Sequence, residues 1–159
     1  MKPPIANLQS IETAETRSPG GRFALLRKHL SRALGHPRDG GVWNGGHPFE
    51  VEHAEIPPGK QNFPFHSHAA AWEFYWILSG RGTLRTEMHR REIGEGDFFI
   101  CLPGEAHQLT AAPETALRYL VIANNPMADL IHYPDSEKWN TKPGRRLFRG
   151  QLDYYDGEE

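Results

Sequence analysis

The chain has 159 residues, with 18 basic side chains, 20 acidic side chains and one cysteine. This length suits one domain, and the near-neutral charge gives no footprint for nucleic acid or for an anionic membrane, so we expect neither as a partner. Cys101 alone allows no intramolecular disulfide, and residues 1–18 contain no apolar leader segment. We therefore expect a cytoplasmic protein.

The first third of the chain is difficult to interpret. Residues 1–20 are polar and contain three prolines, which predicts a flexible N-terminal segment before a single domain at 21–150. Residues 22–34 are ambiguous: their apolar side chains recur at helical spacing, but pairing within a sheet could impose a strand. Residues 36–48 are rich in glycine and proline, which predicts a loop.

From residue 48 onward, short apolar runs alternate with turn residues. We predict strands at 48–56, 72–79, 98–102, 107–110 and 116–123, and a hairpin formed by 82–87 and 90–93. Many short strands with turns between them predict an all-β sandwich or barrel whose core spans 48–124. After Asn124 we predict an irregular segment, and residues 151–159 should form an acidic tail.

The predicted strand 73–78 is apolar on both faces. Ordinary half-exposed strands alternate apolar and polar residues, but here Phe74, Trp76 and Leu78 form a second apolar face. Either another part of the same chain covers this face or a second copy does. A homodimer is the protein partner that we expect.

Four residues could hold a metal ion. His66 and His68 are two positions apart, so on a strand both imidazoles lie on one face. Glu73 opens the next apolar strand, where an unpaired carboxylate would be costly, and His107 begins another strand. Three imidazoles and one carboxylate suit one divalent first-row ion such as Zn, Mn, Fe, Ni or Co.

Two stretches around these residues resemble the two cupin motifs. Residues 59–80, GKQNFPFHSHAAAWEFYWILSG, are similar to the first motif, which spaces a glycine, HxH, a glutamate and a second glycine. Residues 96–107, GDFFICLPGEAH, are similar to the second motif. They depart from it because Gly104 directly follows Pro103 and because no asparagine stands four residues after His107.

The cupin resemblance implies a jelly-roll-like β-barrel that is often dimeric. It also implies that His66, His68, Glu73 and His107 are the metal ligands. The segment 133–139, YPDSEKW, is similar to a subgroup of small bacterial cupins that carries the label sugar-phosphate isomerase.

Three further side chains have a predicted role. Tyr75 and Glu105 lie near the ligands in the sequence and are the candidate catalytic residues. Glu105 is either a proton shuttle or an ordinary exposed carboxylate of its loop, and we favour the loop carboxylate. Arg118 is a basic residue inside an apolar strand, so it needs a partner, either a bound anion or a glutamate of the chain. We favour the glutamate.

These residues predict a metal-binding cupin that acts on a small oxygenated molecule, such as a sugar, a sugar phosphate or a hydroxy or keto acid. Isomerisation or epimerisation is the slightly favoured reaction, with the ion acting as a Lewis acid. A metal-dependent dioxygenase remains an alternative. A second alternative is a cupin that binds a small ligand without turnover, because fold alone does not determine function.

Overall fold

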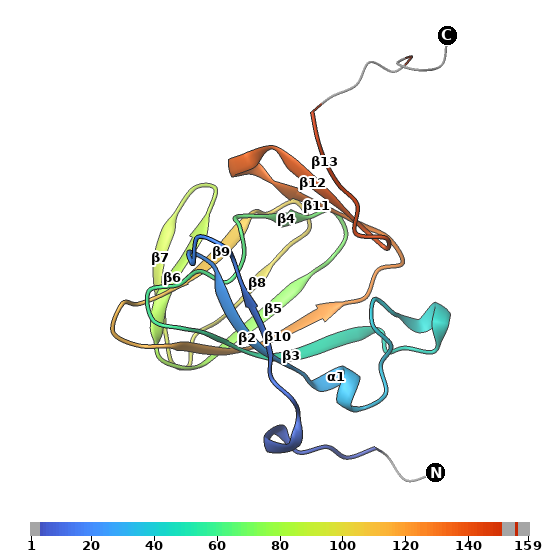
Figure 1. The fold of residues 1–159 in the computed structure, drawn as a ribbon, viewed down its shortest axis with the longest axis horizontal. Helices are drawn as coiled ribbons and strands as arrows, with labels where there is room; N and C mark the ends of the chain where they lie inside the picture. The colour runs from blue at the N-terminus through green and yellow to red at the C-terminus, as the bar shows by residue number, and fades with distance from the viewer. Residues whose placement is uncertain (1–3, 151–154, 156–159) are drawn as a thin grey trace.

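The protein folds into three sheets of antiparallel strands, as expected for an all-β chain (Figure 1). This computed structural model describes residues 4–150 and Tyr155. The strands are β1 (Ala14–Arg17), β2 (Ala24–His29), β3 (Phe49–Ile56), β4 (Ser67–His68), β5 (Glu73–Ser79), β6 (Arg81–Thr86), β7 (Arg90–Gly94), β8 (Phe98–Cys101), β9 (His107–Ala111), β10 (Leu117–Asn124), β11 (Asp129–Tyr133), β12 (Lys138–Lys142) and β13 (Leu147–Arg149). The helical pieces are α1 (Leu30–Ala33) and 3-10 turns at Leu8–Ser10, Val42–Asn44 and Pro134–Ser136. Among the described residues, no helix is long and apolar enough to span a membrane.

The largest sheet has the strand order β1-β2-β3-β10-β5-β8, and it packs against the small sheet β7-β6-β9. The two sheets do not merge into one continuous barrel, but they enclose a common core in the manner of a jelly roll. Fully buried side chains from both sheets form this core: Leu25, Ile56, Ile77, Leu109, Leu117 and Tyr119. The predicted strands of residues 48–124 are therefore confirmed.

The turn between β5 and β6 has room for glycine alone. Gly80 has a φ of +85°, which side-chain-bearing residues rarely adopt. A Cβ atom at this position would lie 1.9 Å from the carbonyl oxygen of Ala116. The glycine that ends the first predicted motif is thus needed for the close approach of β5 and β10.

The ambiguous segment 22–34 contains both kinds of structure. Strand β2 pairs with β3 from Leu26 to His29, and α1 follows at once. The hydroxyl of Ser31 in α1 accepts a hydrogen bond from the backbone N–H of Val51, which ties the helical turn to β3. Pairing with β3 thus overrides the helical spacing of the first half. Strand β1 lies within residues 1–20, where the sequence predicted a flexible segment.

The prediction of an irregular chain after Asn124 is wrong. Residues 129–149 form β11, β12 and β13, which join β4 in a third sheet with the order β13-β12-β11-β4 (Figure 1). The side chains of these strands are mostly half-buried or exposed. Such strands need no alternation of apolar and polar residues, so their sequence does not signal them. Pairing of β11 with β4, of β12 with β11 and of β13 with β12 makes this segment a sheet. The predicted acidic tail, 151–159, lies outside the described residues apart from Tyr155.

Candidate metal centre

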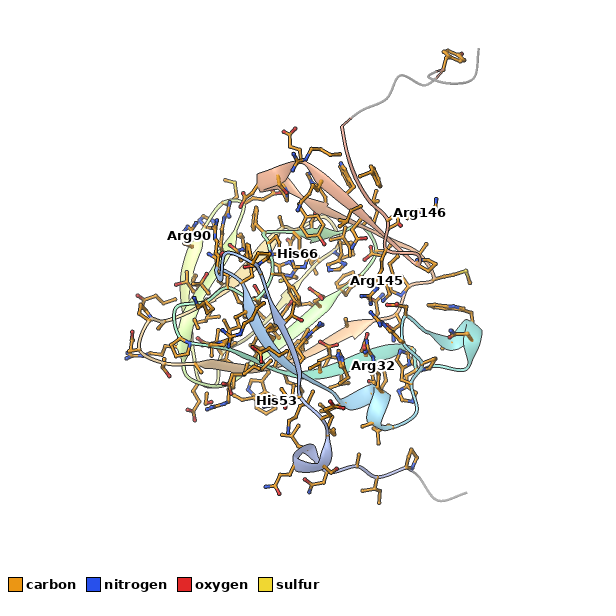
Figure 2. All side chains as sticks on the ribbon, in the orientation of Figure 1. Arg32, His53, His66, Arg90, Arg145 and Arg146 are labelled. Carbon is orange, nitrogen blue, oxygen red and sulfur yellow. The ribbon has the colours of Figure 1, made fainter. Side chains whose placement is uncertain are left out.

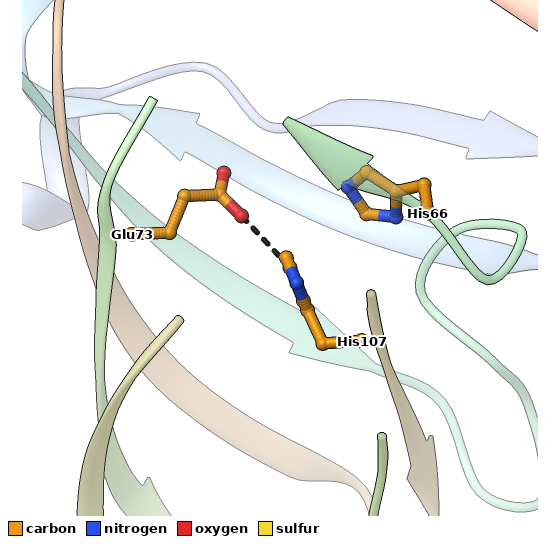
Figure 3. Close-up of side chains that lie close together, drawn as sticks. All are labelled: His66, Glu73 and His107. Carbon is orange, nitrogen blue, oxygen red and sulfur yellow. Dashed lines mark hydrogen bonds and ion pairs between the residues drawn. The ribbon is translucent and has the colours of Figure 1, made fainter. Parts of the chain in front are cut away.

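The predicted metal ligands meet where three separate segments come together (Figure 3). His66 directly precedes β4, Glu73 begins β5 and His107 begins β9. The backbones of His66 and His107 exchange two hydrogen bonds, at 2.8 and 3.2 Å, which brings their ring centroids to 4.7 Å. A pair of antiparallel backbone contacts thus sets two imidazoles side by side although they lie far apart in the sequence.

Each imidazole is oriented by a hydrogen bond at its Nδ1 atom. His66 Nδ1 lies 2.9 Å from the Pro64 carbonyl oxygen, and His107 Nδ1 lies 3.2 Å from the Glu105 carbonyl oxygen. The third ring, that of His68, places Nδ1 2.5 Å from Asp129 Oδ2. Since these acceptors require a proton on Nδ1, Nε2 is the atom through which each imidazole, in its neutral form, would bind an ion.

The Glu73 carboxylate lies among these Nε2 atoms. Its Oε2 is 2.9 Å from His107 Nε2 and accepts a hydrogen bond of 2.9 Å from the Tyr75 hydroxyl. Ligand atoms of His66, Glu73 and His107 all lie within 4.8 Å of one another. His68 Nε2 lies just outside this group, 3.8 Å from Glu73 Oε1. This donor set fits a borderline divalent ion of the first transition row.

The pKa values of these groups reflect their crowding. Burial lowers the pKa of His66 to about 3, with help from the neighbouring His107. Burial opposes ionisation of Glu73 too, but the His107 hydrogen bond and the nearby His68 hold its pKa well below the usual range. Burial also lowers the pKa of His107, but hydrogen bonds with Cys101 and Glu73 outweigh it and raise that pKa overall. Without an ion, Glu73 and His107 therefore form a charged pair.

Asp129 is a site residue that the sequence analysis missed. Its side chain is buried, and besides contacting His68 it accepts a 2.8 Å hydrogen bond from the Ala70 backbone N–H. Carboxylates in this position fix the orientation of a ligating imidazole and increase its basicity. No sequence pattern links positions 68 and 129, because only the pairing of β4 with β11 brings them together.

A cavity of about 260 Å³ opens beside the ligands. His66, His68, Glu73 and Tyr75 contribute to its wall. Its volume lies just below the usual range for ligand pockets, about 300–1,000 Å³. The cavity is therefore suited to a small molecule.

The candidate catalytic residues occupy different surroundings. Tyr75 is buried, lines the cavity and contacts both Glu73 and His107. Glu105 is exposed and is absent from the cavity wall; its carboxylate accepts a hydrogen bond from the backbone N–H of Leu102. The structure thus brings Tyr75 to the ligands, whereas the Glu105 side chain closes a turn.

Arg118 pairs with a glutamate, as favoured from the sequence. Its Nε lies 2.6 Å from Glu55 Oε2 on the neighbouring strand β3. Arg118 is exposed and does not line the cavity. This arginine therefore belongs to the surface of the large sheet.

Comparison with known proteins agrees with this fold. The model of the Cupin domain family matches residues 52–123, which run from within β3 to within β10 and include all four predicted ligands. This region of the chain is therefore similar to the Cupin domain family, and the chain has the cupin fold. No protein with a curated function matches the chain in sequence.

Several solved structures share the fold. A sugar phosphate isomerase of the cupin superfamily from Silicibacter pomeroyi has a TM-score of 0.76 and 20% identity, covering 95% of this chain and 98% of its own. A protein from Acidithiobacillus ferrooxidans, provisionally named sugar phosphate isomerase, has a TM-score of 0.74 and 21% identity over the same shares. A predicted oxalate decarboxylase from Thermotoga maritima has a TM-score of 0.61 and 20% identity, covering 77% of this chain and 99% of its own. At these identities the likeness establishes the fold alone.

Proposed function

We propose that this chain is a metal-dependent enzyme that isomerises or epimerises a small oxygenated molecule, such as a sugar, a sugar phosphate or a hydroxy or keto acid. One observation carries the proposal: His66, Glu73 and His107 converge beside a cavity of small-molecule size. The names of the two structural relatives called sugar phosphate isomerases agree with this reaction class.

The residues divide the chemistry between them. An ion of Zn, Mn, Fe, Ni or Co bound here would supply Lewis-acid polarisation of a substrate oxygen. The buried Tyr75 keeps its proton, because burial and the adjacent Glu73 raise its pKa well above the usual value. Its one hydroxyl hydrogen is donated to Glu73, so the Tyr75 oxygen can accept a hydrogen bond from a substrate hydroxyl, and Asp129 keeps His68 oriented.

Metal analysis combined with an assay tests the proposal. Protein purified without chelators or nickel affinity should contain about one equivalent of divalent metal per chain. It should interconvert aldoses and ketoses, or epimers, in a nuclear magnetic resonance assay, and chelation should abolish this turnover until metal is restored. Iron with substrate-dependent oxygen uptake would instead support the dioxygenase, and metal with ligand binding but no turnover would support the binding protein.

A further inference from the structure

The cavity also has a polar region that the metal site does not use. Five residues define this region, here called the distal cluster: Arg27, Arg32, Glu50, Asn140 and Lys142. They come from β2, α1, β3 and β12, so both ends of the chain contribute. Figure 2 shows Arg32 near α1 and well apart from His66, although both residues line the same cavity.

Most of the unsatisfied polar atoms of the described residues belong to this cluster. Arg27 Nε, Arg32 Nε, Glu50 Oε1 and Asn140 Oδ1 are buried without a hydrogen-bond partner, and one atom elsewhere, Asn62 Nδ2, shares this state. Buried polar atoms are normally satisfied by protein, water or a ligand. Two of the four cluster atoms donate and two accept, and hydroxyl groups can serve both kinds.

Within the part of the chain that the structure describes, one basic side chain around the distal cluster lacks a carboxylate partner. Four basic residues line this part of the cavity, and three of them pair with carboxylates. The pairs are Arg27–Glu52 at 3.4 Å, Arg32–Glu50 at 3.7 Å and Arg145–Asp39 at 2.6 Å. Lys142 has no ion pair among the described residues, so its ammonium group is available to a negatively charged group.

A second metal ion is a poorer occupant for this region. Ligand atoms of His29, Glu50 and Glu52 do lie within 4.8 Å of one another. Both carboxylates, however, already face guanidinium groups, those of Arg27 and Arg32. A divalent ion would be repelled by these neighbours, whereas a hydroxylated ligand would hydrogen-bond with them.

We propose that the distal cluster binds a hydroxylated and negatively charged part of the substrate, with hydroxyls on the arginine, glutamate and asparagine atoms and the anionic group on Lys142. Such a substrate is a sugar phosphate or a sugar acid. This inference rests on the proposed function, because it assigns the substrate class of the same cavity.

Calorimetric titration of the metal-loaded protein tests the inference by binding instead of turnover. The probes are sorbitol 6-phosphate, gluconate, sorbitol and inorganic phosphate. Lys142→Met should weaken binding of the preferred anionic probe at least tenfold and change sorbitol binding less than twofold. Asn140→Leu removes one unsatisfied acceptor and should weaken all three hydroxylated probes, sorbitol included. Arg118→Gln is the matched control, because it removes a cation outside the cavity.

The two probes that are both hydroxylated and anionic identify the source of the charge. Tighter binding of sorbitol 6-phosphate assigns a phosphate, and tighter binding of gluconate assigns a carboxylate. Wild-type protein that holds metal but binds none of the hydroxylated probes overturns this inference and leaves the proposed metal site intact. Wild-type protein that holds no metal but still binds these probes overturns the proposed metal site and leaves this inference intact. Unchanged anion affinity in a folded Lys142→Met variant, checked by its melting temperature, also overturns the inference.

Discussion

The two faces of β5 are in contact with very different surroundings. On the inward face, Glu73 joins the imidazoles and Tyr75 donates a hydrogen bond to it. On the outward face, Trp76 is 48% exposed and pairs in register with Phe98 of β8, which is 70% exposed. Ile100, also on β8, is 50% exposed. One strand thus carries a polar site on one side and an uncovered apolar surface on the other.

The inward face of β5 carries the candidate site, whereas the outward face is a candidate surface for association with another chain. The inward face finds its partners within the chain, whereas the described chain leaves the outward face half uncovered. Exposed apolar patches often mark protein interfaces. The homodimer expected from the sequence stays a prediction, and the outward face of β5 and β8 is where we expect its interface.

Removing two imidazoles should have the largest effect on the inward side. His66→Ala combined with His68→Ala should abolish stoichiometric metal binding, and metal should no longer raise the melting temperature, since an ion stabilises only the state that binds it. Metal analysis and thermal melts check this result, with His89→Ala, on an exposed hairpin, as the control. One equivalent of metal retained by the double variant would show that the site is elsewhere.

A charge on the outward side should break the dimer and leave the metal site unchanged. Trp76→Glu would bury two carboxylates in the symmetric interface, and each costs several kcal/mol, so the dissociation constant should rise at least about a hundredfold. Sedimentation velocity should then find monomers that still bind metal. Met88→Glu, at an 81% exposed position, is the control. Wild-type protein that is monomeric at micromolar concentration would contradict the prediction.

Glu73→Gln tests whether the inward carboxylate ligates the ion. The amide is nearly isosteric but coordinates more weakly, so metal affinity should fall at least about tenfold, or about 1.4 kcal/mol. Added metal should then protect the variant against heat less than it protects the wild type. The outward face should be unaffected, so the oligomeric state should not change. Equal metal-dependent shifts in both proteins would mean that Glu73 is not a ligand.

The smallest effect concerns the pH dependence of the chelator-treated protein. The pKa of buried His66 falls from 6.5 to about 3 on folding, so the unfolded chain takes up a proton first as the pH drops. Stability should therefore be lost as the pH falls from 6.5 toward 3, by about 1 kcal/mol between pH 6.5 and 5.5.

The raised pKa of His107 affects the stability of the folded chain in a higher pH range. Its contribution is present below pH 6.5 and is lost as the pH rises toward its folded value. Urea titrations at several pH values measure the balance, and His66→Gln should flatten the acid side. An equally steep acid loss in that variant would assign the effect to another group.

The sequence alone determined most of the local structure and chemistry of the metal site. Period two along β5 separated Glu73 and Tyr75 from Trp76, and the glycine turns bounded the strands of residues 48–124. The HxH spacing indicated that His66 and His68 act together. These features depend on neighbouring residues, so a local pattern is enough to predict them.

Only the tertiary structure decided which distant residues complete the site. Asp129 reaches His68 because β11 pairs with β4, in a segment where no apolar alternation signals strands. The distal cluster joins Arg32 from the start of the chain with Lys142 from near its end. The first half of segment 22–34 likewise became strand β2 because β3 offered it hydrogen bonds, while α1 follows in the second half. Such contacts arise from pairing between segments far apart in sequence, and no local pattern encodes them.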